Sequence, residues 1–98
     1  MAEIKWSAEA EKSLKEIYDY IATDNLAAAS RVIDGIYEKV QILRSHPRIG
    51  QRFEMMIGRE VREIIYGQYR IPYSVVNEEL IEIIGVFHTA RDVGRYLK

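Results

Sequence analysis

Residues 61–88 read VREIIYGQYRIPYSVVNEELIEIIGVFH, and this stretch decides the fold. Its β-branched and aromatic residues gather in three runs, at 61–66, 69–76 and 80–88. The first junction, Gly67-Gln68, places glycine first, as a type II′ hairpin turn requires. The second junction is the polar segment 77–79. The stretch therefore predicts three consecutive antiparallel strands joined by tight turns.

The first half of the chain has the spacing of a helical hairpin. Residues 2–6 are a short strand candidate, and Ser7 is a natural N-cap for the helix that follows. In that helix Leu14, Ile17, Tyr18 and Ile21 recur at the intervals of an amphipathic α-helix. A second apolar stripe runs through residues 26–43, and Pro47 ends that helix nearby.

These elements predict an α+β fold. An N-terminal strand precedes a two-helix hairpin, the hairpin packs on a mainly antiparallel four-stranded sheet, and a short C-terminal tail follows. The order of the strands in the sheet stays open. Residues 45–60 show no clean period, so we expect a loop there. At 98 residues the chain has the length of one domain, which we place at 1–98.

Composition narrows the class of protein. The chain has no cysteine, which excludes disulfides and thiolate metal sites and fits a cytoplasmic location. We expect no membrane span, because no apolar run approaches the required length of about 18 residues. The net charge is −1, yet residues 43–73 hold six arginines against three glutamates. Basic character is therefore local, and the chain as a whole is poorly suited to neutralising many phosphates.

Several motifs occur in the order and at the spacing of a known superfamily. They are Trp6…Ala10…Leu14…Ile17…Tyr20-Ile21, Ala27-Ala28-Ala29, the segment 43–50, Val61-Arg62, Tyr69-Arg70-Ile71-Pro72-Tyr73, and Ile83 to His88 followed by Arg91-Asp92. Over nearly its whole length the chain resembles the RelE/ParE superfamily of small toxins from prokaryotic type II toxin–antitoxin pairs. The final motif is more similar to the ParE branch, in which Val-x-His followed by Arg-Asp is common.

The resemblance implies a fold, a partner and two alternative activities. ParE-like toxins, known from plasmid stabilisation systems, inhibit DNA gyrase, whereas RelE-like toxins cut messenger RNA in the ribosomal A site. Both are held inactive by a cognate antitoxin. The oligomeric state stays open between a homodimer and a toxin–antitoxin hetero-oligomer. Fold alone does not decide between gyrase and ribosome, and the decision has to come from the site.

An RNA-cleaving site would need a base, an acid and cations for the phosphorane charge. Arg62 and Arg70 on adjacent strands are candidates for the charge, and His88 is a candidate for proton transfer. By resemblance, these three positions match working residues of some RelE-branch nucleases. Thr89 stands where one close group of nucleases has a tyrosine, which argues against this activity. Whether the protein is an enzyme therefore stays open. If it is one, we expect a metal-independent mRNA interferase.

The gyrase interpretation requires contact residues rather than a catalytic centre. The residues that we predict as target contacts are Arg62, Arg70, Tyr73, His88, Arg91, Arg95 and Tyr96. Structural roles compete with this: Arg62 and Arg70 also suit sheet-edge protection, and His88 also suits a hydrogen bond at a strand end. A third interpretation is a non-toxic interaction module that accepts a peptide. His46 and His88 lie far apart without a ligand pattern, so we predict no metal and no cofactor.

Overall fold

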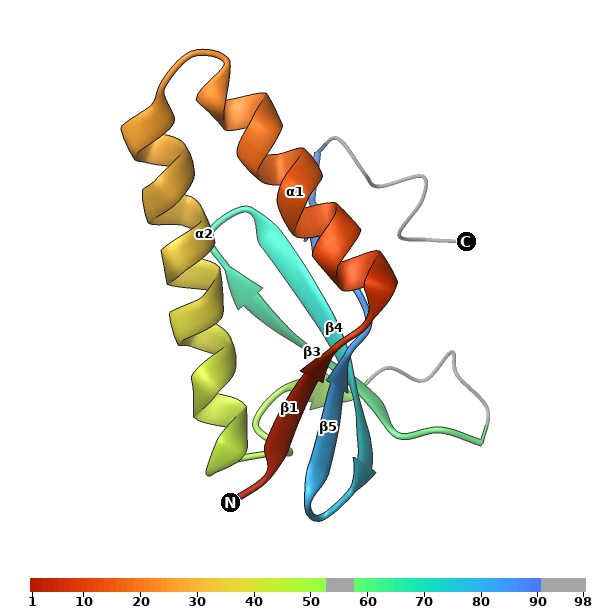
Figure 1. Ribbon diagram of the computed structural model, residues 1–98. Coiled ribbons are helices and arrows are strands. Elements are labelled where there is room, and N and C mark those ends of the chain that lie inside the picture. The colour runs from red at the N-terminus through yellow and green to blue at the C-terminus, as the bar shows by residue number, and fades with distance from the viewer. Residues whose placement is uncertain (53–57, 91–98) are drawn as a thin grey trace.

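The computed structural model describes residues 1–52 and 58–90. Strand β1 (Glu3–Trp6) leads into helices α1 (Ala8–Ala22) and α2 (Leu26–Gln41), and a 3₁₀ turn, η1 (Ile42–Arg44), follows. The remaining strands are β2 (Gln51–Arg52), β3 (Val61–Tyr66), β4 (Tyr69–Asn77), β5 (Leu80–Ile83) and β6 (Phe87–His88). Both helices cover the same face of the sheet (Figure 1).

The sheet has the order β1-β5-β4-β3-β2, with β6 added to β4 beyond the end of β5. β1 pairs with β5 in parallel, and every other described pair is antiparallel. The predicted α+β class and mainly antiparallel sheet are confirmed. The predicted count of four strands is too low, because β2 lies in the expected loop and the expected strand 80–88 is divided into β5 and β6.

Local signals fix the helix and turn boundaries. The Ser7 hydroxyl accepts a hydrogen bond from the Ala10 N–H at 3.0 Å and thereby caps α1. Asn25 caps α2 in the same way through Ala28. Gly67 has φ +58°, and no other described residue near it has a positive φ, which is the type II′ geometry that the sequence predicts.

The core lies between the helices and one face of the sheet. Its fully or almost fully buried members include Ala10, Leu14, Ile17, Ile36, Val40, Leu43, Ile64, Ile71, Tyr73, Val75, Ile81 and Ile83. Gly35 of α2 belongs to this contact, because a Cβ there would overlap the phenol of Tyr66 on β3. The glycine therefore lets α2 approach the sheet closely.

Pro72 sits in the central strand β4 without breaking the ladder. On one side it faces Glu63 of β3. On the other side it lies where the partner changes from β5 to β6, across the interruption at residues 84–86. A missing N–H costs no ladder bond at that interruption, which explains how proline fits a central strand.

Candidate functional site

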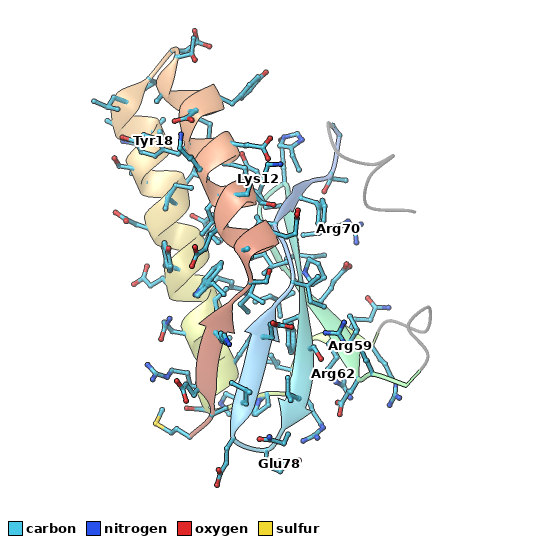
Figure 2. The ribbon with its side chains drawn as sticks, turned by 45° about the vertical axis from the view of Figure 1, so that its right-hand side comes forward. Lys12, Tyr18, Arg59, Arg62, Arg70 and Glu78 are labelled. Atoms are coloured by element: carbon cyan, nitrogen blue, oxygen red, sulfur yellow. The ribbon has the colours of Figure 1, made fainter. Side chains whose placement is uncertain are left out.

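The register between β3 and β4 separates the residues that the sequence grouped. Arg62 lies opposite Tyr73, whereas Arg70 lies opposite Ile65. Since side chains alternate along a strand and directly paired residues share a face, Arg62 projects on the helix side and Arg70 on the other side. Figure 2 shows the two arginines at different levels of the sheet. They do not form one cationic pair.

His88 does not complete a shared centre either. It pairs with Tyr69, which places it on the same face as Arg62. However, Tyr69 and Tyr73 are four residues apart on β4, which separates the two positions by about 14 Å along the strand at roughly 3.4 Å per residue. The three residues proposed for RNA cleavage thus occupy different places, and the structure does not bring them together as a nuclease site.

Arg62 is engaged in holding the loop that enters β2. Its Nε donates to Glu60 Oε2 at 2.8 Å, and its terminal nitrogen donates to the carbonyls of Gly50 at 2.9 Å and Arg48 at 3.3 Å. The side chain is only 17% exposed. A guanidinium that is committed to three acceptors has little capacity left for a target, so its visible role is to fix the loop.

Tyr73 anchors the same loop from beneath. Its hydroxyl donates to the Pro47 carbonyl at 2.8 Å and accepts from the Gly50 N–H at 3.0 Å. The residue is 0% exposed, and burial raises the pKa of its phenol. The prediction of Tyr73 as a target contact is therefore wrong: its alternation places it in the core, where the hydroxyl needs internal partners.

An ion network surrounds this loop anchor. Arg48 bridges Glu78 at 2.8 Å and Glu60 at 2.9 Å, and these two carboxylates raise the pKa of its guanidinium, Glu78 more than Glu60. The hydrogen bond from Arg62 is the main reason why the pKa of the Glu60 carboxyl lies below its usual value, and the bond from Arg48 adds to it. Sequence reasoning did not identify Glu60, which links the two arginines.

Arg70 forms a second, separate ion pair. Its terminal nitrogen lies 2.6 Å from Glu63 Oε1, diagonally across β3 and β4 on the face away from the helices. Glu63 is 7% exposed, and its second oxygen, Oε2, is buried and has no hydrogen-bond partner among the described residues. Arg70 therefore serves first to neutralise a buried carboxylate, a requirement that the sequence signals by placing a glutamate in an apolar strand.

His88 closes the hairpin end of the sheet. Its Nδ1 accepts the Ala90 N–H at 3.2 Å, so in the neutral ring the proton sits on Nε2, which lies 2.9 Å from Gln68 Oε1. Its ring also meets Tyr69 edge to face, with centroids 5.3 Å apart. These contacts match the structural role that the sequence left open for His88, with Gln68 as a partner.

Comparison with known proteins identifies the family. The sequence model of the family described as "ParE toxin of type II toxin-antitoxin system, parDE" matches residues 4–93. The chain belongs to this ParE toxin family. It is also similar to "Putative toxin Y4kP" of Sinorhizobium fredii (strain NBRC 101917 / NGR234), with 32% identity over 87 residues, 87% of this chain and 85% of that protein.

A solved structure supports the fold of this ParE-family chain. The structure titled "Chromosomal ParDE TA system from P. aeruginosa" matches with a TM-score of 0.71, covering 90% of this chain and 96% of that chain. Its sequence identity is 22%, so the likeness concerns the fold. The suspected membership of the RelE/ParE superfamily, on the ParE branch, is confirmed by the family match.

Three predicted contacts of this ParE-family chain, and its metal-binding and membrane-spanning potential, are considered next. The predicted contacts Arg91, Arg95 and Tyr96 lie outside the described residues, and their role stays a prediction. Within residues 1–52 and 58–90, no three His, Asp or Glu side chains are arranged to hold a metal ion. The two helices in those ranges fall short of the length and hydrophobicity that a bilayer span requires.

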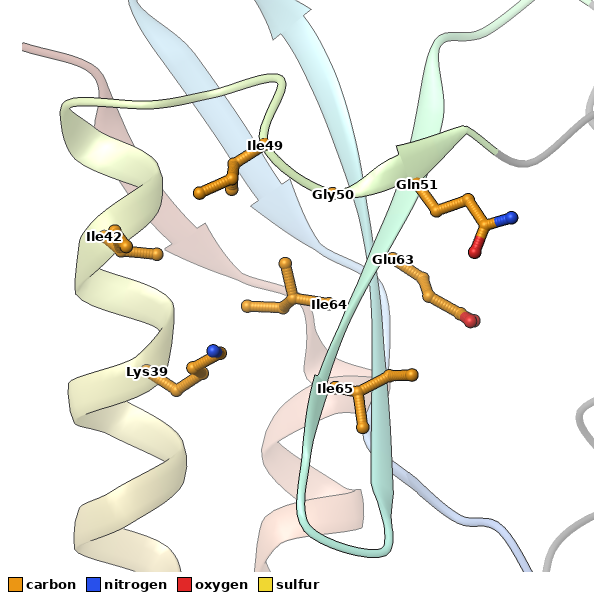
Figure 3. A pocket seen from close by; sticks show the side chains of 8 residues that line it. All are labelled: Lys39, Ile42, Ile49, Gly50, Gln51, Glu63, Ile64 and Ile65. Atoms are coloured by element: carbon orange, nitrogen blue, oxygen red, sulfur yellow. The ribbon is translucent and has the colours of Figure 1, made fainter.

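A hollow beside β3 is the feature that sequence reasoning missed. It has a volume of about 240 Å³ and lies between the C-terminal end of α2 and β3. Its lining residues are Lys39, Ile42, Ile49, Gly50, Gln51, Glu63, Ile64 and Ile65 (Figure 3). Because these residues come from three separate segments, no local pattern predicts the hollow. Ile49, an apolar residue between Arg48 and Gly50, is the clearest sequence signal for it.

Proposed function

We propose that this ParE-family toxin acts by inhibiting DNA gyrase and that a cognate antitoxin holds it inactive in the cytoplasm. The family match supports the toxin class, and the resemblance to the ParE branch supplies the target. Plasmid stabilisation is the corresponding biological role. A toxin of this kind needs a contact surface rather than a reaction centre, and its affinity rests on a few anchor residues.

The observation that carries the choice of gyrase over messenger RNA is the dispersal of the nuclease residues. Arg62 is committed to the loop, Arg70 is paired with Glu63, and His88 lies on the face opposite to Arg70. General acid–base catalysis with phosphorane stabilisation needs such groups within hydrogen-bond reach of one reacting phosphate. Residues that point to different faces of a sheet do not meet that requirement.

Contacts with gyrase are proposed at the surface residues that keep an accessible head group. Arg70 and His88 belong to this set, because their residues are partly exposed, and Arg91, Arg95 and Tyr96 extend it along the sequence. Arg62 contributes indirectly, since it holds the loop. The proposal predicts that substitution of Arg95 removes toxicity but does not change the melting temperature of the protein.

The deciding experiment adds purified toxin to gyrase and relaxed plasmid, in parallel with a translating ribosome and a defined message. We expect loss of supercoiling or accumulation of cleaved plasmid, and an intact message. The variant His88→Ala serves as a discriminating control: it would abolish RNA cleavage by a His-dependent nuclease, whereas inhibition of gyrase, in which His88 is one contact among several, should be weakened but retained. Normal supercoiling at saturating toxin, or codon-positioned cuts that His88→Ala removes, would refute the proposal.

A further inference from the structure

The edge of β3 is open next to the hollow. β2 pairs with β3 at residues 62 and 63, and no described strand pairs with that edge beyond Glu63. Tyr66 and Tyr69 flank the two-residue turn and form a hydrogen-bonded pair, so the next pair, Ile65 and Arg70, does not exchange backbone bonds. The N–H and C=O of Ile65 therefore point outward, toward the position where another strand would lie.

This edge lacks the protection that the other edge has. On β1, the exposed residues are Glu3 and Lys5, and charged side chains of this kind discourage pairing with another strand. Beside β3, the exposed residues are instead Ile42, Ile49 and Ile65, at 39%, 56% and 50% exposure. Exposed aliphatic side chains around an open strand edge favour an intermolecular contact.

The charge inside the hollow selects the partner. Figure 3 shows Lys39 extending from α2 toward Ile64. Among the described residues Lys39 has no ion-pair partner, as is also true of Lys5, Lys12, Arg31, Arg44 and Arg52, and of these six cations Lys39 is the one that lines the hollow. A carboxylate from a partner protein would form an ion pair with Lys39.

We propose that an extended segment of the antitoxin adds to the edge of β3 at Ile65 and fills this hollow. The proposal rests on the proposed function, because it takes the antitoxin as the partner. The segment's central residue exchanges two backbone hydrogen bonds with Ile65. Its two neighbours project toward α2, since side chains alternate along a strand. The neighbour level with Ile64 is aliphatic and packs between Ile42 and Ile49, and the other carries a carboxylate that pairs with Lys39.

A second copy of this chain fits the edge less well. If β3 paired with β3 of a second copy about Ile65, the segment that entered the hollow would be residues 64–66. That segment is Ile-Ile-Tyr and offers no carboxylate to Lys39. A symmetric contact also sets each patch against its own copy, which repeats the same positive charge on both sides. The chemistry of the hollow thus favours a different, acidic chain.

The test measures the affinity of the full-length antitoxin for four full-length toxin variants by calorimetry. Lys39→Glu and Ile49→Glu alter the hollow, and Lys12→Glu and Leu26→Glu are matched changes at exposed positions on α1 and at the start of α2. We expect the Kd to rise by about tenfold or more for the hollow variants and by less than about twofold for the controls. Thermal melts verify that all four fold.

A second readout does not depend on any substitution. In the free toxin the Ile65 amide should exchange rapidly with solvent, and in the complex its exchange should slow by about a hundredfold or more, as a new backbone bond protects it. An Asp or Glu of the antitoxin whose change to Lys restores the affinity of Lys39→Glu would identify the pairing residue.

The outcomes separate this inference from the proposed function. If the wild-type toxin binds and is neutralised, but the hollow variants bind like the wild type or the Ile65 amide is not protected, the docking assignment is wrong and the toxin role stands. Equal weakening by the control variants also overturns the assignment. Concentration-dependent dimers that Ile65→Glu abolishes would assign the edge to a second copy. A wild-type chain that is harmless and binds no antitoxin would instead remove the proposed function.

Discussion

Replacement of Arg62 by methionine tests the conclusion that this arginine is a structural anchor. Methionine keeps most of the apolar stem but removes the hydrogen bonds to Glu60, Gly50 and Arg48. Glu60 retains Arg48 as a partner, so the largest loss is the buried Gly50 carbonyl, which is left without its donor. An orphaned buried acceptor costs about 1–3 kcal/mol, and the lost charged bond adds to it, giving about 2–4 kcal/mol in total.

The expected change is large for a chain of 98 residues. At about 4–8 °C per kcal/mol, a loss of about 2–4 kcal/mol should lower the melting temperature of Arg62→Met by about 8–32 °C. The matched control is Arg59→Met. Arg59 pairs with Glu82 at 3.5 Å, its side chain is 46% exposed, and the loss of such a pair should cost well under about 1 kcal/mol.

The pH dependence gives the same prediction a second signature. The pKa of Glu60 is lower in the folded protein than the ordinary value of 4.5, so its contribution to stability is present above 4.5 and is lost as the pH falls through the folded value. Because Arg62 is the main cause of that shift, the variant has less of this contribution to lose. The gap in melting temperature should therefore narrow between about pH 6 and about pH 3.

Calorimetric melts of the wild type and both variants across this pH range provide the measurement. A melting temperature of Arg62→Met within about 2 °C of the wild type would refute the reasoning. So would a variant that folds like the wild type but has lost toxicity, since that result would make Arg62 a direct contact of the target.

Three further changes probe the same face and its neighbour. Tyr73→Phe removes the bonds to Pro47 and Gly50 and should cost about 1–3 kcal/mol in denaturant unfolding. Since burial raises the Tyr73 pKa, the wild type should also lose stability as the pH rises above the ordinary value of 10.0, and Tyr73→Phe should lose less over that range. Arg70→Ala should destabilise by about 1–3 kcal/mol by stranding the Glu63 carboxylate, and the double variant with Glu63→Leu should recover part of the loss in the same titration. Gly50→Ala should cost about 1–3 kcal/mol in thermal melts, because its Cβ would lie 2.6 Å from the Glu63 carbonyl oxygen, a backbone atom that cannot swing aside.

Much of the fold follows from local signals in the sequence. Ser7 and Gly67 each act through one or two neighbouring groups, so the residue type alone indicates a cap or a turn. The two-residue strands β2 and β6 could not be predicted in this way. β2 exists because Arg62 and Tyr73, which follow it by ten and more positions, hold the preceding loop against the sheet. The partner of a short strand is a property of the assembled sheet and leaves no period in its own sequence.

The site shows the same limit more sharply, because it depends on the register of one hairpin. Arg62 and Arg70 lie on the two strands of the hairpin, Arg62 four residues before Tyr66 and Arg70 one residue after Tyr69. Because Tyr66 pairs with Tyr69, Arg62 lies an even number of residues from this pair and Arg70 an odd number. Alternation along the strands therefore sends the two side chains to opposite faces of the sheet. On the core face Arg62 bonds both the Glu60 carboxylate and the Gly50 carbonyl of the loop, whereas on the outer face Arg70 bonds the buried Glu63 carboxylate. The two cations are thus explained by separate structural demands, and among the described residues the edge of β3 at Ile65 stays exposed, with no strand paired to it.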